Sequence, residues 1–310
     1  MTSEPTVAVL VPCFNEASTI AQVVAGLRVA LPFATIYACD NNSSDDTAEC
    51  ARRAGAVVLS EPRQGKGNAV RTMFASIEAE VYVLIDGDGT YHSASAPLMV
   101  NLLREQKLAM VVARRVHSET SAYAAGHLWG NRLFTDVVAR LFGATFTDIL
   151  SGYRVFSRKF VKSFPSFSEG FEIETELTVH ALTLRLPVRE LPSAYAPRPA
   201  GSVSKLHKYR DGYRILLRIL SLVQNERPLA FFSAIGLALF AIAIGLAWPI
   251  VLTFMETHKV PRFPTAILAT GIAVSGFISL ACGLILDNVS RGRREAKLLA
   301  YLATSASISA

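Results

Sequence analysis

The chain has 310 residues, of which 51% are hydrophobic and only 18% are charged, and its formal net charge is +6. This hydrophobic content excludes an intrinsically disordered chain, and 4 cysteines are too few for a small disulfide-rich scaffold. The mean hydropathy of +0.34 indicates a globular domain joined to membrane segments. Because the basic residues cluster beside the most apolar runs, we expect a membrane partner and no nucleic acid.

The first 115 residues alternate strand-like apolar runs with helical patterns. Such alternation predicts right-handed crossovers and an α/β domain with a mostly parallel sheet flanked by helices. Strands are expected at Val7–Val11, Thr35–Cys39, Ala56–Leu59, Val81–Ile85 and Met110–Ala113, and helices at Thr19–Ala30, Thr47–Ala54, Asn68–Ala79 and Ala96–Gln106.

Polar and charged residues follow each predicted strand. Ligands of open α/β sheets bind at the carboxyl ends of the strands, so these residues should meet at one edge. Carboxylates, glycines and bases gathered there suit a nucleoside diphosphate held with a divalent metal. In strand order the residues are Pro12, Asn15 and Glu16, then Asp40 to Ser43, then Arg63 and Gly65 to Gly67, then Asp86 to Asp88, then Arg114 and Arg115.

The segment Asp86-Gly87-Asp88 gives the sharpest signal, because a buried strand ends there in two acids one residue apart. Mg²⁺ or Mn²⁺ prefers such oxygen ligands and would remove the repulsion between the two carboxylates. The alternative is an ordinary acidic turn, since Asp-Gly is a common turn dipeptide. The polar residues at the other strand ends favour the metal site over the acidic turn.

The segment Gly65 to Asn68 begins a predicted helix. Its backbone amides, together with Lys66, suit a phosphate, and the alternative is a plain basic loop.

Two C-terminal segments, Leu229–Phe254 and Thr265–Leu286, contain no Asp, Glu, Lys, Arg or His over 26 and 22 residues. Both exceed the roughly 20 residues that cross a bilayer, although two buried helices of a soluble core are the alternative. Basic residues flank the pair, and Met1–Pro5 shows no signal peptide. We therefore expect a multi-pass membrane protein with both ends and the catalytic domain in the cytoplasm, and Met255–Pro264 outside.

Between the domain and the first span, Lys208–Glu226 has apolar residues on one side and arginines nearby. This pattern is typical of a helix lying in the headgroup plane, with a core-packed helix as the alternative. The expected organisation is a catalytic domain at 1–206, an interfacial helix at 207–228, a hairpin at 229–287 with spans at 229–254 and 265–287, and a cytoplasmic tail at 288–310.

Seven motifs in order resemble those of the family 2 glycosyltransferases with the GT-A fold, a Rossmann-like α/β fold. The likeness extends to the polyprenyl-phosphate sugar transferases, such as dolichyl-phosphate mannose synthases and bacterial undecaprenyl-phosphate glucosyltransferases, and covers essentially the whole chain. The motifs are Val11 to Glu16, Asp40 to Thr47, Gly65 to Gly67, Asp86 to Asp88, Asp148 to Arg154, Gly170 to Glu174, and Arg198 to Lys205.

The resemblance implies a role for each site residue. A nucleotide-sugar pocket, a metal site, an acceptor-phosphate site and a catalytic centre are expected. The nucleotide sugar would contact Pro12, Asn15, Glu16, Asp40, Lys66 and Asp86; Asp86 and Asp88 would hold Mg²⁺ or Mn²⁺; Arg115, Arg132, Arg198 and Lys205 would bind the acceptor phosphate; and Asp148, with Asp86 and Asp88, would be catalytic.

The chain departs from the family pattern at two positions. Mannose synthases often carry a further metal-binding Gln two residues beyond the second Asp, where this chain has Thr90. They also carry an Arg where this chain has His127, with Arg132 five residues later. The first departure affects the expected metal contacts, and the second affects the expected contacts with the acceptor phosphate.

The implied reaction transfers one sugar from a nucleotide sugar to a polyprenyl phosphate of undecaprenyl or dolichyl type. UDP-sugars are favoured over GDP-sugars, and the product would donate its sugar to extracytoplasmic glycosylation. A phosphate acceptor has a second pKa near ~6, so it is already anionic and needs no strong base. Asp148 is therefore expected to be a modest base or an orienting group, and a single displacement would invert the anomeric centre.

Two other functions stay open at this point. A processive polysaccharide synthase would carry a Gln-x-x-Arg-Trp motif, but neither Trp129 nor Trp248 follows an arginine. A non-catalytic membrane scaffold with a retained GT-A fold would tolerate loss of the acidic pair, which is present. The sequence leaves the oligomeric state open, a homo-oligomer included.

Overall fold

The structure is a computed structural model, and it describes residues 6–117, 147–166, 168, 170, 172–196, 220–221 and 223–305. The chain divides into two compact units. One comprises residues 1–206 with 297–310, and the other comprises residues 207–296.

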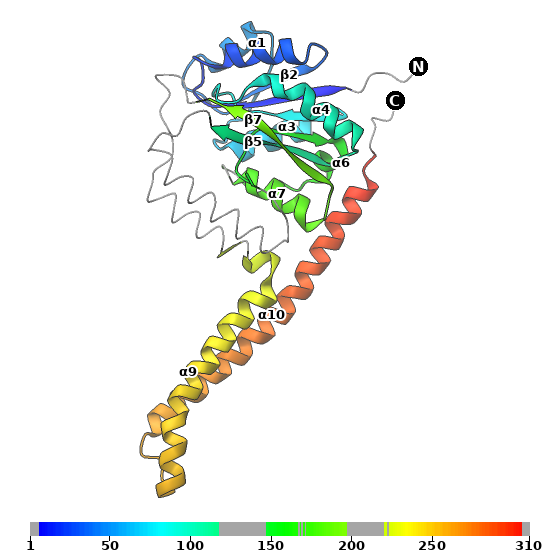
Figure 1. Cartoon of the computed structure of the whole chain (residues 1–310). Coiled ribbons are helices and arrows are strands. Elements are labelled where there is room, and N and C mark those ends of the chain that lie inside the picture. The colour runs from blue at the N-terminus through cyan, green and yellow to red at the C-terminus, as the bar shows by residue number, and fades with distance from the viewer. Residues whose placement is uncertain are drawn as a thin grey trace. The chain divides into compact units, whose positions relative to one another are not determined.

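A seven-stranded sheet forms the centre of the first unit, in the order β3-β2-β1-β4-β6-β5-β7. β6 is antiparallel to β4 and β5, and the other neighbouring pairs are parallel, which confirms the mostly parallel sheet (Figure 1). The strands are β1 (Val7–Cys13), β2 (Thr35–Asp40), β3 (Val57–Ser60), β4 (Val81–Leu84), β5 (Met110–His117), β6 (Arg154–Ser157) and β7 (Val188–Tyr195).

Helices cover both faces of the sheet because side chains of the buried strands alternate between two apolar clusters. In β1, Val9 and Val11 pack in the cluster that includes α1 and α4, while Ala8 and Leu10 pack in the cluster that includes α3, α6 and α7. The helices are α1 (Ile20–Ala30), α2 (Thr47–Arg53), α3 (Lys66–Ser76), α4 (Ala96–Glu105), α6 (Arg158–Ser163) and α7 (Ile173–Thr183), with a short 3₁₀ turn at Ser93–Ser95.

The register brings the carboxyl ends of the first strands to one level. Cys13 at the end of β1 pairs with Asp40 at the end of β2, and Asp40 pairs with Ser60 at the end of β3. On the other side of β1, Leu10 pairs with Leu84, the last residue of β4. The loops that leave these strands therefore start from one edge.

Two differences from the sequence prediction shape this edge. β5 does not end at Ala113 but runs to His117, because it pairs with β7 along its whole length. Arg114 and Arg115 consequently lie within the strand. α3 begins at Lys66, two residues earlier than expected, so Lys66 is in the first helical turn.

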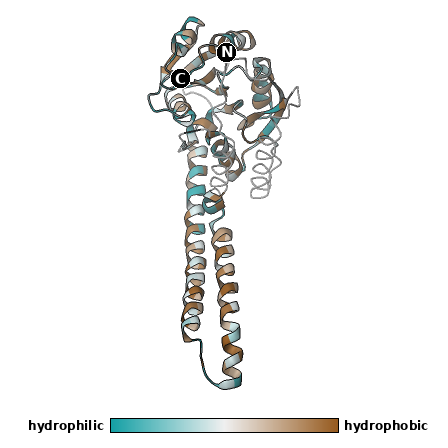
Figure 2. Cartoon of the chain, turned by 90° about the vertical axis from the view of Figure 1, so that its left-hand side faces the viewer, coloured by the Kyte–Doolittle hydropathy of each residue, from teal (hydrophilic) through white to brown (hydrophobic). Residues whose placement is uncertain are grey.

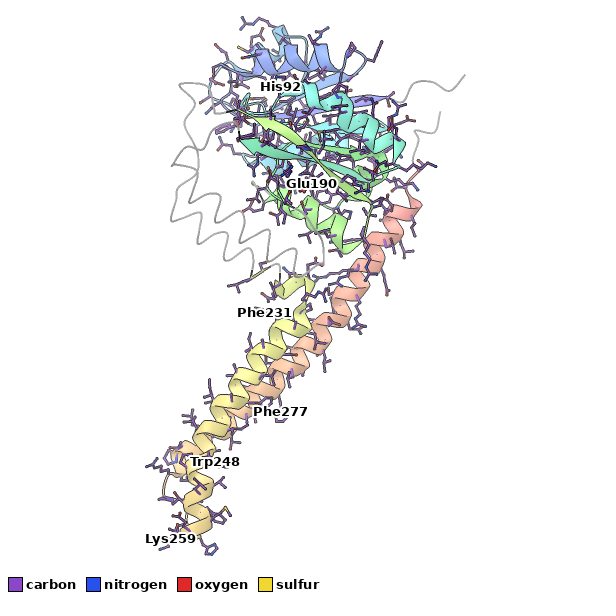
Figure 3. The ribbon with its side chains drawn as sticks, viewed as in Figure 1. His92, Glu190, Phe231, Trp248, Lys259 and Phe277 are labelled. Carbon is purple, nitrogen blue, oxygen red and sulfur yellow. The ribbon has the colours of Figure 1, made fainter. Side chains whose placement is uncertain are left out.

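The second unit contains α9 (Pro228–Thr257) and most of α10 (Phe263–Ala303), which form a hairpin of two helices long and apolar enough to cross a membrane. Apolar residues cover much of both helices, while the connecting turn and the C-terminal part of α10 are more hydrophilic (Figure 2). Trp248 and Phe277 are 62% and 66% exposed (Figure 3). A helix pair with so many uncovered apolar side chains is typical of a lipid environment.

Close contacts hold the two helices together. The Phe240 and Phe277 rings lie 4.8 Å apart, and the Ser279 hydroxyl donates to the Phe232 carbonyl at 2.9 Å. A Cβ on Gly236 would lie only 3.1 Å from the Gly276 carbonyl oxygen, so glycine permits this approach.

Both helices extend beyond the expected spans at 229–254 and 265–287, and α10 continues through much of the segment expected as a tail. Of the expected interfacial segment at 207–228, the structure describes 220–221 and 223–228, with helix at 220–221 and 223–226. The rest of that segment lies outside the described residues.

Candidate active site

Hydrogen bonds between neighbouring loops tie the β1 end to the β2 end. Asn15 has a positive φ of 52°, a conformation that asparagine tolerates better than most residues. Its amide N–H donates to the Ser43 hydroxyl at 3.0 Å, and its side-chain oxygen accepts from the Ser44 N–H at 2.8 Å. The Glu16 N–H donates to the Thr47 hydroxyl at 2.8 Å. The loop that carries Asn15 and Glu16 is thereby fixed, and Pro12 lies just before it in β1, paired with Cys39.

Asp40 is the last residue of β2 and Asn41 follows it directly, and the two side chains have different surroundings. Asn41 is buried and joins the third loop, donating to the Glu61 and Arg63 carbonyls at 3.1 and 2.7 Å and accepting from the Gly65 N–H at 2.6 Å. The sequence analysis placed Asn41 at this edge from its position directly after a strand, but gave it no role of its own. Asp40 Oδ1 is buried without a hydrogen-bond partner in the described part of the chain. Such an orphaned acceptor fits the N–H group of a nucleotide base.

Lys66 lies between two carboxylates. Its ammonium forms an ion pair with Asp86 and a second with Glu174 at 2.6 Å, and its side chain is 8% exposed. Burial alone would lower the pKa of Lys66, but the charges of Asp86 and Glu174 raise it above its ordinary value. A Cβ on Gly152 would collide with the Asp86 carboxylate and lie 2.7 Å from Lys66 Nζ, so a larger residue there would have to displace this pair.

Asp88 is buried and bound by its own turn. Its Oδ1 accepts from the Thr90 N–H at 3.1 Å and from the Thr90 hydroxyl at 2.5 Å. Thr90 is the residue at which the chain departs from the family pattern, and its hydroxyl fixes the orientation of the Asp88 carboxylate. Gly87 leaves room for the Glu16 carboxylate, with which a Cβ there would collide.

The donor set at the end of β4 fits a hard divalent cation. Among the residues that the structure describes, no group of three or more His, Cys, Asp or Glu side chains is arranged to hold a metal. Mg²⁺ commonly binds through one or two carboxylates, with phosphate oxygens and waters completing the shell. Asp86 and Asp88 would suffice for a metal that is held jointly with a diphosphate.

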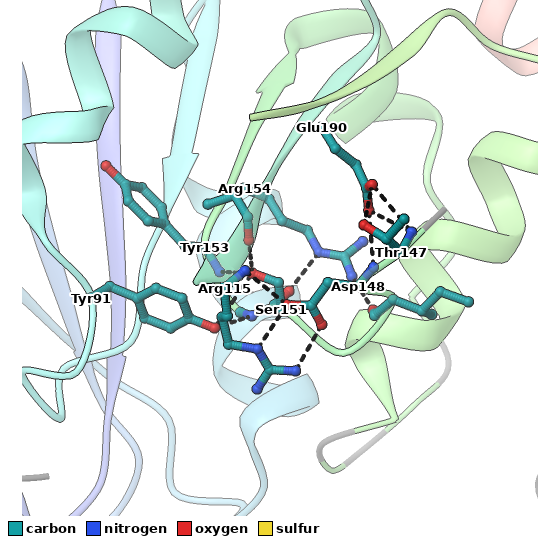
Figure 4. Close-up of polar contacts among 11 residues, drawn as sticks. Tyr91, Arg115, Thr147, Asp148, Ser151, Tyr153, Arg154 and Glu190 are labelled. Atoms are coloured by element: carbon teal, nitrogen blue, oxygen red, sulfur yellow. Dashed lines mark hydrogen bonds and ion pairs between the residues drawn. The ribbon is translucent and has the colours of Figure 1, made fainter. Parts of the chain in front are cut away.

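Arg115 and Asp148 form a two-point ion pair beside these residues. Arg115 Nε donates to Asp148 Oδ2 at 2.8 Å, Nη2 donates to Oδ1 at 2.7 Å, and the Arg115 backbone N–H donates to Oδ2 at 3.0 Å (Figure 4). Burial would raise the pKa of Asp148, but the Arg115 guanidinium holds it below its ordinary value. A carboxylate that is stabilised in this way as an anion accepts a proton weakly. The ion pair with Arg115 therefore favours an orienting role for Asp148 over a role as general base.

Two further residues support the loop that carries Asp148, and the sequence reasoning missed both. The Glu190 carboxylate on β7 accepts from the Thr147 and Asp148 N–H groups, each at 3.0 Å. Arg154 is fully buried, and it donates from Nε to the Ser151 carbonyl at 2.8 Å and from Nη2 to the Ile149 carbonyl. Burial lowers the pKa of Arg154 to about 10. The only available signal was the position of Arg154 at the end of a recognised motif.

Aromatic residues join the turn after Asp88 to the end of β7. The Gly152 N–H donates to the Tyr91 hydroxyl at 2.9 Å, and the Tyr91 and Tyr195 rings lie 5.0 Å apart. The Arg115 guanidinium lies 5.6 Å from the centre of the Tyr195 ring. The Ala196 N–H donates to the Thr90 carbonyl at 2.9 Å.

The structure brings two pairs of the predicted site residues into direct contact. Asp86 contacts Lys66, and Arg115 contacts Asp148. The remaining predicted acceptor residues, Arg132, Arg198 and Lys205, and also His127, lie outside the described residues.

Residues 8–164 match the model of the glycosyl transferase family 2 domain. The chain belongs to glycosyl transferase family 2. It is therefore a glycosyltransferase, and the scaffold alternative is set aside.

Relatives and solved structures agree with this assignment. Glycosyltransferase AglJ of Haloferax volcanii is 32% identical, with 95% of this chain and 97% of the relative covered. The dolichyl-phosphate hexose transferase of the same organism is 27% identical over 71% of this chain and 95% of the relative. A structure of Mycobacterium tuberculosis glucosyl-3-phosphoglycerate synthase with Mn²⁺, UDP and phosphoglyceric acid has a TM-score of 0.55 at 23% identity, covering 72% of this chain and 78% of that one. The likeness to that structure supports the GT-A fold.

Proposed function

We propose that this glycosyltransferase transfers one sugar from a nucleotide sugar to the phosphate of a membrane polyprenyl phosphate of undecaprenyl or dolichyl type. The observation that carries the proposal is the combination, in one chain, of the acidic end of β4 with two apolar helices long enough to cross a bilayer. The similarity to a relative named dolichyl-phosphate hexose transferase supports the acceptor class. The product would be a lipid-linked monosaccharide that donates its sugar outside the cytoplasm.

The nucleotide would occupy the edge formed by the β1, β2 and β4 ends. The orphaned Asp40 oxygen is suited to the base, and Lys66 lies beside Asp86, where a diphosphate would approach. Asp86 and Asp88 would hold Mg²⁺ or Mn²⁺, and the bound metal would stabilise the charge that develops on the leaving diphosphate. A uridine nucleotide is favoured over guanosine, in line with the UDP and Mn²⁺ in the glucosyl-3-phosphoglycerate synthase structure.

The acceptor would be bound beside the Arg115–Asp148 pair. A phosphate monoester with a second pKa near ~6 is largely a dianion at neutral pH, so it can attack the anomeric carbon without a strong base. The lowered pKa of Asp148 agrees with this, because an anion held by Arg115 is better suited to orient that cation than to take a proton. Arg132, Arg198 and Lys205 would complete the acceptor-phosphate site, and a single displacement would invert the anomeric centre.

The same proposal places the enzyme in a membrane as a hairpin with both termini in the cytoplasm. Nucleotide sugars are cytoplasmic, and the basic residues after the apolar part of α10 favour that side. A cysteine introduced at Thr257 should react with an impermeant thiol reagent in intact cells, and a cysteine at Ser3 should not. The reverse labelling would contradict both the topology and the proposed substrate.

A substrate screen tests the proposed reaction. The purified full-length chain in lipid nanodiscs is given undecaprenyl phosphate, Mn²⁺ and radiolabelled UDP- or GDP-sugars, one at a time. We expect one nucleotide sugar to yield a labelled lipid that carries a single sugar and is absent without the lipid phosphate. Label in a growing polymer would support a processive synthase and contradict the proposal.

A further inference from the structure

One recognised motif, Gly170 to Glu174, has no role in the reaction proposed above. Its last residue, Glu174, lies in the first turn of α7, where the helix dipole favours a negative charge. The Glu174 side chain is only 6% exposed, and its carboxylate accepts from Lys66 Nζ at 2.6 Å. A residue 108 positions away in sequence thus contacts the charged group beside Asp86.

The surroundings of Glu174 contain buried cations that need a counterion. Lys66 is one, and Arg154 is the other, because Glu174 also interacts electrostatically with it. The Arg154 guanidinium donates to neutral oxygens of Ser151, Ile149 and Thr178, and the Thr178 hydroxyl donates in turn to the Glu174 carbonyl at 3.0 Å. Lys66 thus contacts the Glu174 carboxylate directly, Arg154 interacts with its charge, and the Thr178 hydroxyl bonds the backbone of the same residue.

We propose that Glu174 is a positioning residue that holds Lys66 beside Asp86 and so sets the affinity of the site for the metal-bound nucleoside diphosphate. The inference rests on the proposed function, because it takes Asp86 as a metal ligand. A divalent ion and the Lys66 ammonium compete for the same Asp86 carboxylate. Glu174 gives the ammonium a second carboxylate, so Lys66 stays paired when Asp86 turns to the metal.

When the charge of Glu174 is removed, the Lys66 ammonium still has the ion pair with Asp86. An unpaired buried ammonium is strongly unfavourable, so Lys66 would hold Asp86 against the metal. The backbone of Gly152 lies close beside the pair, since a Cβ there would lie 2.7 Å from Lys66 Nζ. The expected result is weaker binding of metal and nucleoside diphosphate together, with no direct effect on the lipid acceptor.

Isothermal titration of the full-length chain in nanodiscs tests the inference without turnover. Wild type is titrated with UDP and with GDP over a series of Mn²⁺ concentrations, and the tighter ligand is the probe. Glu174→Gln should weaken binding of the Mn²⁺-bound probe by about tenfold, equivalent to one pKa unit of interaction between charges. Glu176→Gln, the same change on the same helix, should bind like wild type, because Glu176 accepts from the Ser168 N–H.

A double-mutant cycle separates positioning through Lys66 from a general structural effect. In a Lys66→Met background, Glu174→Gln should cause no further loss of binding. If Glu174→Gln alone does not fold, the double variant still provides a test, because it removes the positive charge of Lys66 together with the negative charge of Glu174. Equal binding by Glu174→Gln and wild type, or a full additional loss in the Lys66→Met background, would overturn the inference.

Intact nucleotide binding by a wild-type chain that never glycosylates polyprenyl phosphate would instead refute the proposed acceptor and leave the role of Glu174 standing. A wild-type chain that binds neither nucleotide would overturn both.

Discussion

The proposed donor side of the site differs in construction from the proposed acceptor side. The donor side comprises Glu16, Asp40, Lys66, Asp86 and Asp88, and the acceptor side comprises Arg115, Asp148 and Glu190. On the donor side, most contacts join loops that leave neighbouring parallel strands at one level. On the acceptor side, Arg115 on β5 binds Asp148, which precedes the antiparallel β6, and Asp148 is held by Glu190 on β7. The donor side follows from the strand-and-helix alternation, whereas the acceptor side depends on where β6 and β7 join the sheet.

The largest effect is expected on the donor side, at Asp88. Asp88→Ala should reduce turnover at least ~100-fold, a loss of roughly 3 kcal/mol of transition-state stabilisation, because the metal would lose a direct ligand. Steady-state kinetics with a melting curve for the same protein would measure both activity and folding. Thr90→Val, which removes only the hydroxyl that orients Asp88, should cost less. Full activity of wild type in a metal chelator would contradict the role of the acidic pair.

A smaller effect is expected on the acceptor side, at Asp148. Asp148→Asn leaves Arg115 without its carboxylate, so kcat/KM for the lipid phosphate should fall by roughly tenfold to 100-fold through misorientation of the cation. Nucleotide affinity, measured by titration calorimetry, should stay unchanged. Glu190→Gln keeps an acceptor for the two backbone N–H groups and should have a weaker effect. A matching loss of nucleotide affinity would remove the distinction between the two sides.

Arg198 and Lys205 extend the acceptor side into residues outside the described structure. Neutralising either, as in Lys205→Gln, should raise the apparent KM for the lipid phosphate by about tenfold, since a hydrogen bond to a charged group contributes about 1.5–3 kcal/mol. Arg189→Gln, an exposed arginine on β7, is a matched control that should change little. If Lys205→Gln impaired nucleotide-sugar binding alone, Lys205 would belong to the donor side.

The smallest effect on catalysis, and a visible one on stability, is expected at His180 on α7. His180 packs edge-on against Phe160 and Phe164, each ring centre 5.3 Å away, and burial, with a smaller contribution from Lys297, lowers its pKa to about 4. Between its ordinary pKa of 6.5 and 4 the unfolded chain binds more protons than the folded one, so stability should fall as pH falls through this window. By linkage the loss reaches about 3 kcal/mol at most.

Thermal melts at pH 7.5 and pH 5 would measure this contribution. His180→Phe should show a smaller drop in melting temperature between the two values than wild type. An identical pH dependence in both proteins would show that His180 does not titrate as its buried position requires.

Sequence patterns predicted the first five strands, four helices and the meeting of their polar ends, because each depends on short stretches of chain. They failed where pairing partners decide the structure. β5 continues through Arg114 and Arg115 only because β7 lies beside it, and β7 contains a proline and alternates weakly. Glu174 and Arg154 were recognised as parts of motifs, but their roles come from contacts between α7, β6 and α3, which no local pattern encodes.

Matched lipid acceptors would show whether the phosphate of the lipid is the group that receives the sugar. The purified chain, Mn²⁺ and the active nucleotide sugar are incubated with undecaprenyl phosphate or with undecaprenol, and the lipid products are analysed by mass spectrometry. We expect one added sugar on undecaprenyl phosphate, joined through a phosphodiester, and no product from undecaprenol. Glycosylated undecaprenol, or more than one sugar per lipid, would contradict it.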